Sequence, residues 1–101
     1  MAVAETSLEA RKSVEPYIPS MKQRVFDFIF DRGARGATTD EIEVELKLSH
    51  QTASARITEL SFEGYIRRQY VKATYEMVKR PTRSGRQAFV YEIVPGMYYG
   101  I

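Results

Sequence analysis

Apolar residues recur at helical spacing in the first two thirds of the chain, and the first such pattern covers residues 21–32. Ser20 is suited to be the N-cap of this helix, Gln23 is placed to bond back to it, and Gly33 ends it. Apolar side chains cover more than half of the helix, so the N-terminal segment, the sheet or another subunit must cover a second face. The inward stripe consists of Met21, Val25, Phe28 and Ile29, and the second face carries Phe26 and Phe30.

Two further helical patterns follow, each opened by a capping residue. Thr38 and Glu41 have the spacing of a capping box, which predicts a helix over residues 39–47. Ser49 is suited to cap a helix from residue 50 to about residue 63. The inward positions are Ile42 and Leu46 in the first of these helices, Leu48 in the turn, and Ala53, Ile57 and Leu60 in the second helix.

After Gly64 the period of the pattern changes from that of a helix to that of a strand. Residues 65–71 and 88–94 alternate as two strands of a hairpin do, and Pro95 ends the second of them. Proline followed by Ser-Gly within residues 79–86 is turn chemistry. Residues 72–78 either extend the first strand into a long arm or are irregular, and the pattern does not decide between the two.

Residues 1–16 are polar, with few large apolar side chains. The spacing of Thr6 and Glu9 is that of a capping box, so one short helix ended by Pro16 is expected, frayed or docked on a neighbour. At the other end, Tyr98 and Tyr99 are expected to dock the tail on the domain.

Charge is distributed unevenly along the 101 residues, although the net charge is only +2. Residues 1–64 hold eight Lys or Arg against eleven Asp or Glu, whereas residues 65–101 hold seven against two. Six of the seven tyrosines also lie in the basic part. Such asymmetry predicts a surface at the C-terminal end that faces a polyanion.

Several classes of protein are disfavoured by what the sequence lacks. There is no cysteine and only one histidine, and no apolar run has membrane-spanning length. The first residues do not resemble a signal peptide, so a cytoplasmic location is expected. The acidic residues of the second helix could suggest a metal site, but the helix dipole explains them better. Without a nucleophile elbow, a phosphate-cradling loop or metal-ligand spacing, no enzyme activity, metal or cofactor is predicted. These acidic residues are Asp40, Glu41, Glu43 and Glu45.

The outer face of the third predicted helix carries short donors and acceptors, which suit base edges in a major groove. The hydroxyl of Ser49 and the helix N-terminus suit a phosphate. His50 is either a reader of bases or a solvated residue of the first turn, and Arg56 either contacts a base or pairs with Glu59 or Glu63. The candidate DNA-binding residues here are Ser49, His50, Gln51, Thr52, Ser54, Arg56 and Thr58.

The hairpin carries most of the positive charge. Seven basic residues stand between residues 65 and 89 against Glu76 alone, enough for roughly six phosphate contacts. The cationic tip, which contains a glycine, suits a phosphate backbone or a minor groove, with a solvated turn as the alternative. The candidate DNA-binding residues of the tip are Lys79, Arg80, Arg83, Ser84 and Arg86.

Three stretches together resemble a known family. Residues 36–42 (GATTDEI), 48–60 (LSHQTASARITEL) and 64–66 (GYI) look like the helix-turn-helix of winged-helix DNA-binding proteins. Residues 80–91 (RPTRSGRQAFVY) are similar to the wing of small winged-helix proteins of phages and prophages, most of unassigned role. The chain departs from that pattern at Ala55, where many relatives carry a basic residue, and in about eight extra residues before the wing.

The resemblance implies an α+β fold, a winged helix-turn-helix with a three-helix core and a C-terminal β-hairpin wing. The domain would span residues 17–95, with tails at 1–16 and 96–101. It implies binding of double-stranded DNA by a phage or bacterial transcriptional regulator, with a recognition helix starting near His50.

Two alternatives stay open beside that expectation. One is a protein-interaction module that uses the same fold. The other is a DNA-binding accessory of phage replication, recombination or packaging. A homodimer is also expected as an option, because Phe26, Phe30 and Phe62 provide spare apolar surface; Phe62 either marks such a contact or packs under a hairpin tyrosine.

Overall fold

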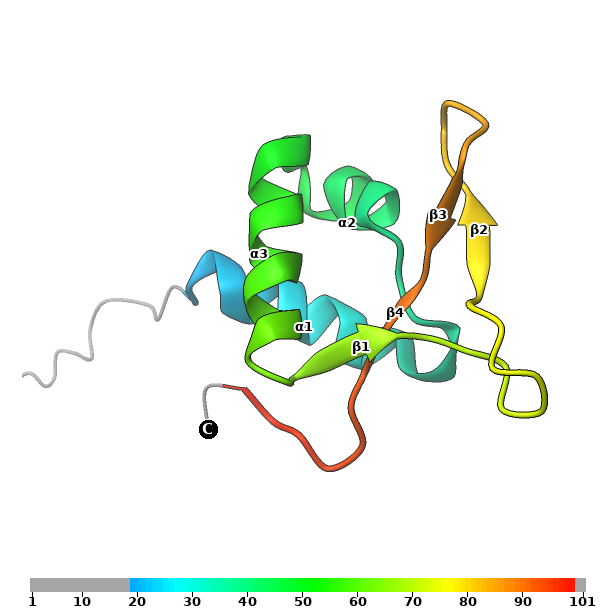
Figure 1. The fold of residues 1–101 in the computed structure, drawn as a ribbon. Coiled ribbons are helices and arrows are strands. Elements are labelled where there is room, and N and C mark those ends of the chain that lie inside the picture. The colour runs from blue at the N-terminus through cyan, green and yellow to red at the C-terminus, as the bar shows by residue number, and fades with distance from the viewer. Residues whose placement is uncertain (1–18, 100–101) are drawn as a thin grey trace, which may run out of the picture.

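The computed structural model describes residues 19–99, so the segment 1–16 and the last two residues lie outside the described part. The fold is α+β, with three helices followed by short antiparallel strand pairs (Figure 1). The expected order of elements is confirmed. The elements are α1 (Met21–Arg32), the short 3₁₀ turn η1 (Gly33–Arg35), α2 (Thr39–Leu46), α3 (His50–Phe62), β1 (Ile66–Arg68), β2 (Lys79–Pro81), β3 (Gln87–Phe89) and β4 (Tyr91–Ile93).

All three helices begin at the expected caps. The side chains of Ser20, Thr38 and Ser49 each accept a hydrogen bond from a backbone N–H three residues on. At Thr38 the full capping box forms, because the Glu41 side chain also accepts from the Thr38 N–H. The expected return bond of Gln23 is wrong, since its side-chain amide donates to Asp27 one turn further on, at 2.8 Å.

The core forms where the three helices meet β1 and β4. The inward residues expected on α3 are all buried, as is Ile42 of α2. On α1 the division between the two faces is wrong in one respect: Phe26 is only 3% exposed, whereas Phe28 is half-buried. The buried apolar residues are Val25, Phe26, Ile29, Ala37, Ile42, Ala53, Ile57, Leu60, Ile66 and Val90.

Aromatic residues from outside the helices cover the second face of α1. The rings of Tyr65 and Tyr99 pack on Phe26 with centroid distances of 6.0 and 6.1 Å. Tyr98 packs on Phe30 at 5.7 Å. The expected docking of the C-terminal tail is confirmed for these two tyrosines, and Phe26 is thereby removed from any subunit surface.

The strand pairing differs in part from the single hairpin that the sequence predicts. β1 and β4 pair antiparallel with Ile66 opposite Ile93, as expected, but each has only three residues. β2 and β3 form a second antiparallel pair. The chain changes partner at buried Val90, whose N–H donates to the Val78 carbonyl and whose carbonyl accepts from the Gln69 N–H. The two expected strands are therefore shorter, and the arm between them has a pair of its own.

Most of residues 72–78, the segment left open by the sequence pattern, lie in a closed turn formed by residues 71–76. The Val71 N–H donates to the Glu76 carbonyl at 2.8 Å, and the Tyr75 N–H donates to the Val71 carbonyl at 2.6 Å. Tyr70 and Met77, the residues on either side of the turn, pair through an isolated β-bridge. The β2–β3 hairpin then stands beside α2, with its tip at the same end of the molecule as the start of α3 (Figure 1).

Helix lengths also bear on the relation to membranes. The longest helix among residues 19–99 has 13 residues. Within this range no helix is both long and apolar enough to cross a bilayer.

Candidate nucleic-acid interface

Two adjoining grooves separate α3 from the strands. The first lies between the start of α3, α2 and the β2–β3 hairpin, with His50 on one wall and Arg86 and Phe89 on the other. The second lies between the C-terminal half of α3, at Thr58, and Arg68 of β1. Tyr91 lines both grooves. We refer to this continuous surface, from the outer side of α3 to the hairpin tip, as the α3–hairpin face.

Glu41 of α2 holds the hairpin through Arg80. The guanidinium of Arg80 makes two bonds to the Glu41 carboxylate, at 2.7 and 2.8 Å, and also donates to the carbonyls of Arg35 and Gly36. Arg32 of α1 donates to the same carboxylate at 2.6 Å. Arg80 was predicted to contact DNA, but the structure directs its charge to α2, where it fixes the position of the hairpin.

The ion pairs shift the pKa values of both partners. Burial alone would raise the pKa of Glu41, but hydrogen bonds from Arg80 and from the Thr38 N–H, with the charges of Arg80 and Arg32, bring it below its ordinary value of 4.5. The hydrogen bond to Glu41 raises the pKa of Arg80. Both groups are therefore charged at neutral pH, and the link between α2 and β2 is ionic.

Asp40 and Glu43 bind the hairpin tip in the same way. Asp40 accepts from both the backbone N–H and the side-chain Nε of Arg83, at 3.1 and 2.7 Å, and Glu43 accepts from Arg83 Nη2 at 3.0 Å. The hydrogen bond to Asp40 is the main cause that raises the pKa of Arg83. The Arg83 side chain still has 63% of its surface exposed, so it can also reach a ligand.

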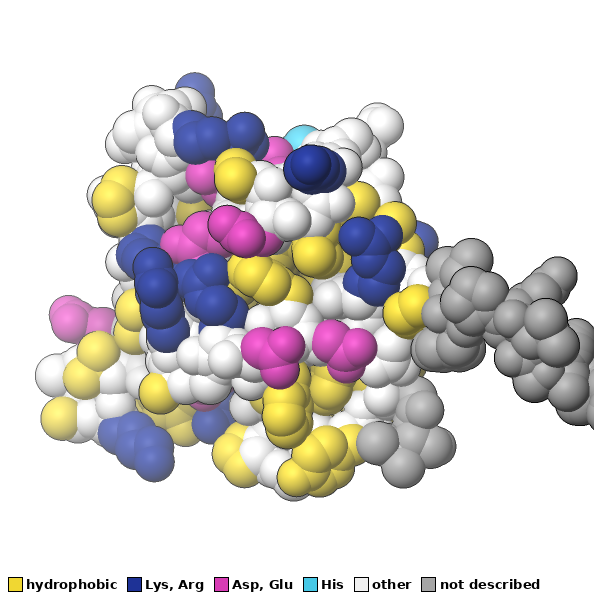
Figure 2. Space-filling view, turned by 180° about the vertical axis from the view of Figure 1, so that it is seen from behind, with side chains coloured by type: hydrophobic (Ala, Val, Ile, Leu, Met, Phe, Trp, Pro, Cys, Tyr) yellow, Lys and Arg dark blue, Asp and Glu magenta, His cyan; other side chains and the backbone are white. Residues whose placement is uncertain are grey.

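The acidic residues of α2 thus do more than favour a helix N-terminus, which was the interpretation from sequence. Basic side chains lie next to acidic ones where α2 and the hairpin meet, at the upper left of Figure 2. Glu43 also lies 2.8 Å from Nδ1 of His50. The sequence signal for these pairs was the presence of acidic residues at positions 40, 41 and 43 in α2 together with arginines at positions 80 and 83 in the hairpin.

Three other cations of β1 and the β2–β3 hairpin form no ion pair within residues 19–99: Arg68, Lys79 and Arg86. The Arg68 guanidinium lies 4.0 Å from the centroid of the Phe89 ring, and the Lys79 ammonium lies 5.1 Å from it. The ring of Phe89 thereby gathers two cations on the α3–hairpin face. Arg68 and Phe89 were absent from the predicted site, although the alternation of the strands would have placed them there.

The outer face of α3 agrees with its expected pattern, with Gln51, Ala55 and Thr58 exposed. Arg56 is bound to Glu59 at 2.9 Å, which is the structural alternative considered for it. Phe62 is 90% exposed, so the idea that it packs under a hairpin tyrosine is wrong.

The structure brings most of the predicted DNA-binding residues to one surface. His50, Arg83, Ser84 and Arg86 line the first groove and Thr58 lines the second. Ser49 caps the start of α3, where its hydroxyl accepts from the Thr52 N–H and donates to the Thr52 hydroxyl at 3.0 Å. Gln51 and Ser54 lie on α3 itself. Whether any of these residues contacts DNA stays a prediction.

The chain matches no known protein-family model, and no characterised protein is significantly similar to it. Among residues 19–99 no group of three or more potential metal ligands comes together.

Proposed function

We propose that this chain is a winged-helix protein that binds double-stranded DNA through the α3–hairpin face and regulates transcription. In this proposal α2 and α3 are the helix-turn-helix and the β2–β3 hairpin is the wing. The observation that carries it is a group of three cations, Arg68, Lys79 and Arg86, that form no ion pair within residues 19–99 and lie beside the uncharged outer face of α3.

Shape supports a duplex as the ligand. A major groove is about 12 Å wide and admits one helix, provided that the side chains on the exposed face are short. α3 offers Gln51, Ser54 and Thr58 there, and Gln can bind adenine with two hydrogen bonds. The hairpin tip lies at the same end as the start of α3, where it would lie along the neighbouring backbone (Figure 1).

The ionic contacts with α2 give the hairpin a definite position before DNA arrives. Arg80 binds Glu41 and the carbonyls of Arg35 and Gly36. Arg83 binds Asp40 nearer the tip, so the hairpin is held at two points along its length. A surface that is already in place loses less conformational entropy on binding. The cations that remain for phosphates are Arg68, Lys79, Arg86 and the exposed part of Arg83.

The test is the affinity for a blunt random-sequence duplex at low salt. Lys79→Ala combined with Arg86→Ala removes two phosphate contacts and should weaken binding by about tenfold or more. The control is Arg24→Ala combined with Arg35→Ala, which removes the same charge from α1 and η1, outside both grooves. Absence of binding by the unmodified protein, or equal losses in the two double variants, would refute the proposal.

One observation favours a second function, contact with another protein chain. Phe62 exposes 90% of its surface at the C-terminal end of α3, so almost the whole ring is open to a partner. If a second copy covers it, Phe62→Asp should convert a dimer to a monomer in sedimentation equilibrium. Ser61→Asp adds the same charge next to it without removing the ring, and should leave the dimer intact. A monomeric unmodified protein at high concentration would exclude this self-association.

A further inference from the structure

A third groove lies on the other side of the β1–β4 pair. Arg67 lines both this groove and the groove beside α3, whereas Arg68 and Tyr91 line only the α3–hairpin face and Glu92 lines only the third groove. Because successive side chains of a strand point to opposite faces, Tyr91 and Glu92 of β4 point to opposite sides of the β1–β4 pair. Duplex binding by the α3–hairpin face therefore leaves the third groove open except at Arg67.

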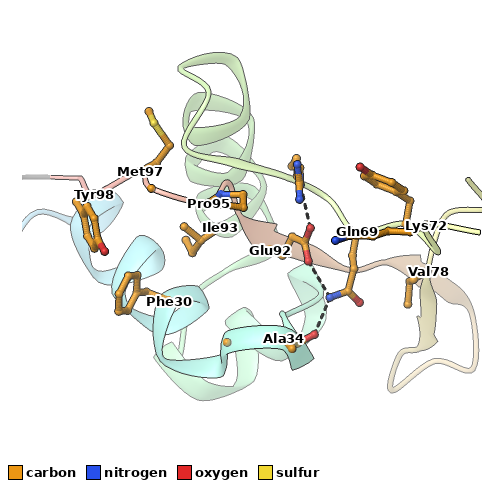
Figure 3. A pocket seen from close by; sticks show the side chains of 14 residues that line it. Phe30, Ala34, Gln69, Lys72, Val78, Glu92, Ile93, Pro95, Met97 and Tyr98 are labelled. Atoms are coloured by element: carbon orange, nitrogen blue, oxygen red, sulfur yellow. Dashed lines mark hydrogen bonds and ion pairs between the residues drawn. The ribbon is translucent and has the colours of Figure 1, made fainter.

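The floor of the third groove is polar, but its charges are matched. Glu92 accepts from Arg67 Nε at 2.9 Å and from the Gln69 amide at 3.0 Å. Gln69 also donates to the carbonyl of Ala34 at 2.6 Å, which ties the chain just after β1 to the η1 turn (Figure 3). The carboxylate of Glu92 is thus neutralised by Arg67 and does not repel an anion strongly.

Tyr70 lines one end of the groove, and Tyr75 stacks on Tyr70 just beside that end. The rings of Tyr70 and Tyr75 have centroids 5.8 Å apart and planes 18° apart. The Arg67 guanidinium lies 5.5 Å from the Tyr70 ring, and Tyr75 is 74% exposed. One face of the stack is therefore backed by the protein, whereas Tyr75 presents a ring to solvent.

The exposed tyrosine is held firmly. Tyr75 has φ of +63°, a left-handed conformation that is unfavourable for a bulky residue. The hydrogen bonds of the 71–76 turn fix this conformation, including that from the Tyr75 N–H to the Val71 carbonyl. A ring that is already in place stacks on a ligand at low entropic cost.

The opposite end of the groove carries a second aromatic pair. Phe30 and Tyr98 face each other at 5.7 Å, with 45% and 58% of their surfaces exposed (Figure 3). Lys72 projects from the 71–76 turn and forms no ion pair within residues 19–99. The groove thus has exposed aromatic rings at one end and beside the other, together with a cation that has no acidic partner in the described part of the chain.

We infer that this groove binds single-stranded nucleic acid, with one base stacked on Tyr75, another on Tyr98, and a phosphate at Lys72. Stacking rings along a cationic groove are how proteins hold unpaired strands without reading their sequence. An unpaired strand is required, because the bases of a duplex do not expose their faces. The inference is independent of the duplex proposal, since different residues on a different face carry it.

The test uses a fluorescent oligothymidylate of about eight nucleotides and measures its anisotropy with the full chain. Tyr75→Leu keeps an apolar side chain but removes the aromatic ring, and should weaken binding by about tenfold. Tyr75→Phe keeps the ring and should bind as the unmodified protein does. Tyr98→Leu provides an independent second variant with the same expected loss, and circular dichroism verifies that each variant is folded.

Blunt duplex separates the two sites. The affinity of the protein for blunt duplex should be unchanged by Tyr75→Leu. Conversely, Lys79→Ala combined with Arg86→Ala should leave the affinity for oligothymidylate within about twofold of that of the unmodified protein. An excess of blunt duplex should not displace the oligonucleotide. The same series with oligouridylate distinguishes DNA from RNA as the strand bound. The inference is overturned if neither oligonucleotide binds, if Tyr75→Leu binds as well as Tyr75→Phe, or if duplex displaces the strand.

Discussion

At the scale of single residues, Glu41 joins two parts of the molecule. Its carboxylate completes the capping box of α2 and at the same time binds Arg80 of the hairpin and Arg32 of α1. Both the carboxylate and the guanidinium of Arg32 are partly buried, so water would only partly replace the carboxylate if Glu41 were substituted. One side chain therefore contributes to both helix formation and hairpin position.

Glu41→Gln should lower the free energy of unfolding by about 1–3 kcal/mol, because charge-assisted hydrogen bonds to Arg80 and Arg32 are weakened. Glutamine can still complete the capping box, so the loss reports mainly on the ion pairs. Urea unfolding measures it. Glu45→Gln, an exposed position on the same helix, should change the free energy by less than about 0.5 kcal/mol. Equal effects of the two substitutions would contradict the role given to Glu41.

The depressed pKa of Glu41 predicts a dependence of stability on acid. Its folded-state pKa lies below the ordinary value of 4.5, so its contribution is complete above that pH and is lost as the pH falls through the depressed value. Unfolding titrations between neutral pH and the acid range should show a steeper loss for the unmodified protein than for Glu41→Gln. Parallel curves would show that Glu41 does not titrate with folding.

Gly36 is required by a close approach between chain segments. Its φ is +62°, and a Cβ at this position would lie 2.5 Å from the carbonyl oxygen of Tyr91 and 2.7 Å from Val90. The neighbouring Ala37 exchanges two backbone hydrogen bonds with Tyr91, at 2.9 and 2.8 Å. An added methyl group would push these strands apart.

Gly36→Ala should therefore destabilise the fold by about 3 kcal/mol or more, through both the unfavourable φ and the clash. Gly33→Ala is a matched control, because Gly33 has φ of +58° but no atom within 4 Å of an added Cβ. It should lose only about 1–2 kcal/mol. Thermal or urea unfolding distinguishes the two, and similar losses would mean that the approach to Tyr91 is not tight.

At the scale of elements, the helices could be predicted because their signals are local. Ser20, Thr38 and Ser49 each stand directly before a run of helical period, and the structure has a helix start at each. The strands were less predictable. Residues 87–93 form one extended run, and nothing local shows that it pairs with β2 up to Phe89 and with β1 from Tyr91.

The candidate interface could likewise be predicted only in part from the sequence. The residue types of α3 and of the hairpin tip indicated the surface, but not which cations are unpaired. Arg80 and Glu41 are 39 positions apart, so their pairing depends on how the hairpin folds back onto α2. The contribution of Phe89 likewise depends on a cross-strand contact with Lys79.

The docking of the hairpin on α2 gives a prediction for the element as a whole. Asp40→Ala removes the two hydrogen bonds that Asp40 accepts from Arg83, so the hairpin tip should open more often. The amide hydrogen of Arg83 should exchange with solvent about tenfold faster, whereas amides in the middle of α1 should keep their rates. Unchanged exchange at Arg83 would show that the tip is held by the hairpin alone.

At the scale of the whole molecule, the distribution of charge limits the number of phosphates that the protein can neutralise. The sequence suggests roughly six contacts, but Arg67 and Arg80 are bound to Glu92 and Glu41. Arg68, Lys79, Arg86 and the exposed part of Arg83 remain on the α3–hairpin face. Lys72 lies at the third groove, and it does not add to this number.

The logarithm of the duplex association constant should therefore fall with the logarithm of salt concentration with a slope of about −3 to −4. Titrations of a blunt duplex at several salt concentrations give the slope. A slope near −6 would mean that DNA displaces the acidic partners of Arg67 and Arg80, and a slope near zero would exclude phosphate contacts.

The proposal that the α3–hairpin face binds duplex DNA is tested most directly by amide chemical-shift mapping with ¹⁵N-labelled protein. On titration with a blunt duplex, the largest shifts are predicted at the start of α3 around Gln51, at the hairpin tip around Arg86, and at Phe89. Residues of the third groove, such as Lys72, should shift little. Shifts confined to other surfaces, or none at low salt, would contradict the assignment of this face as the DNA interface.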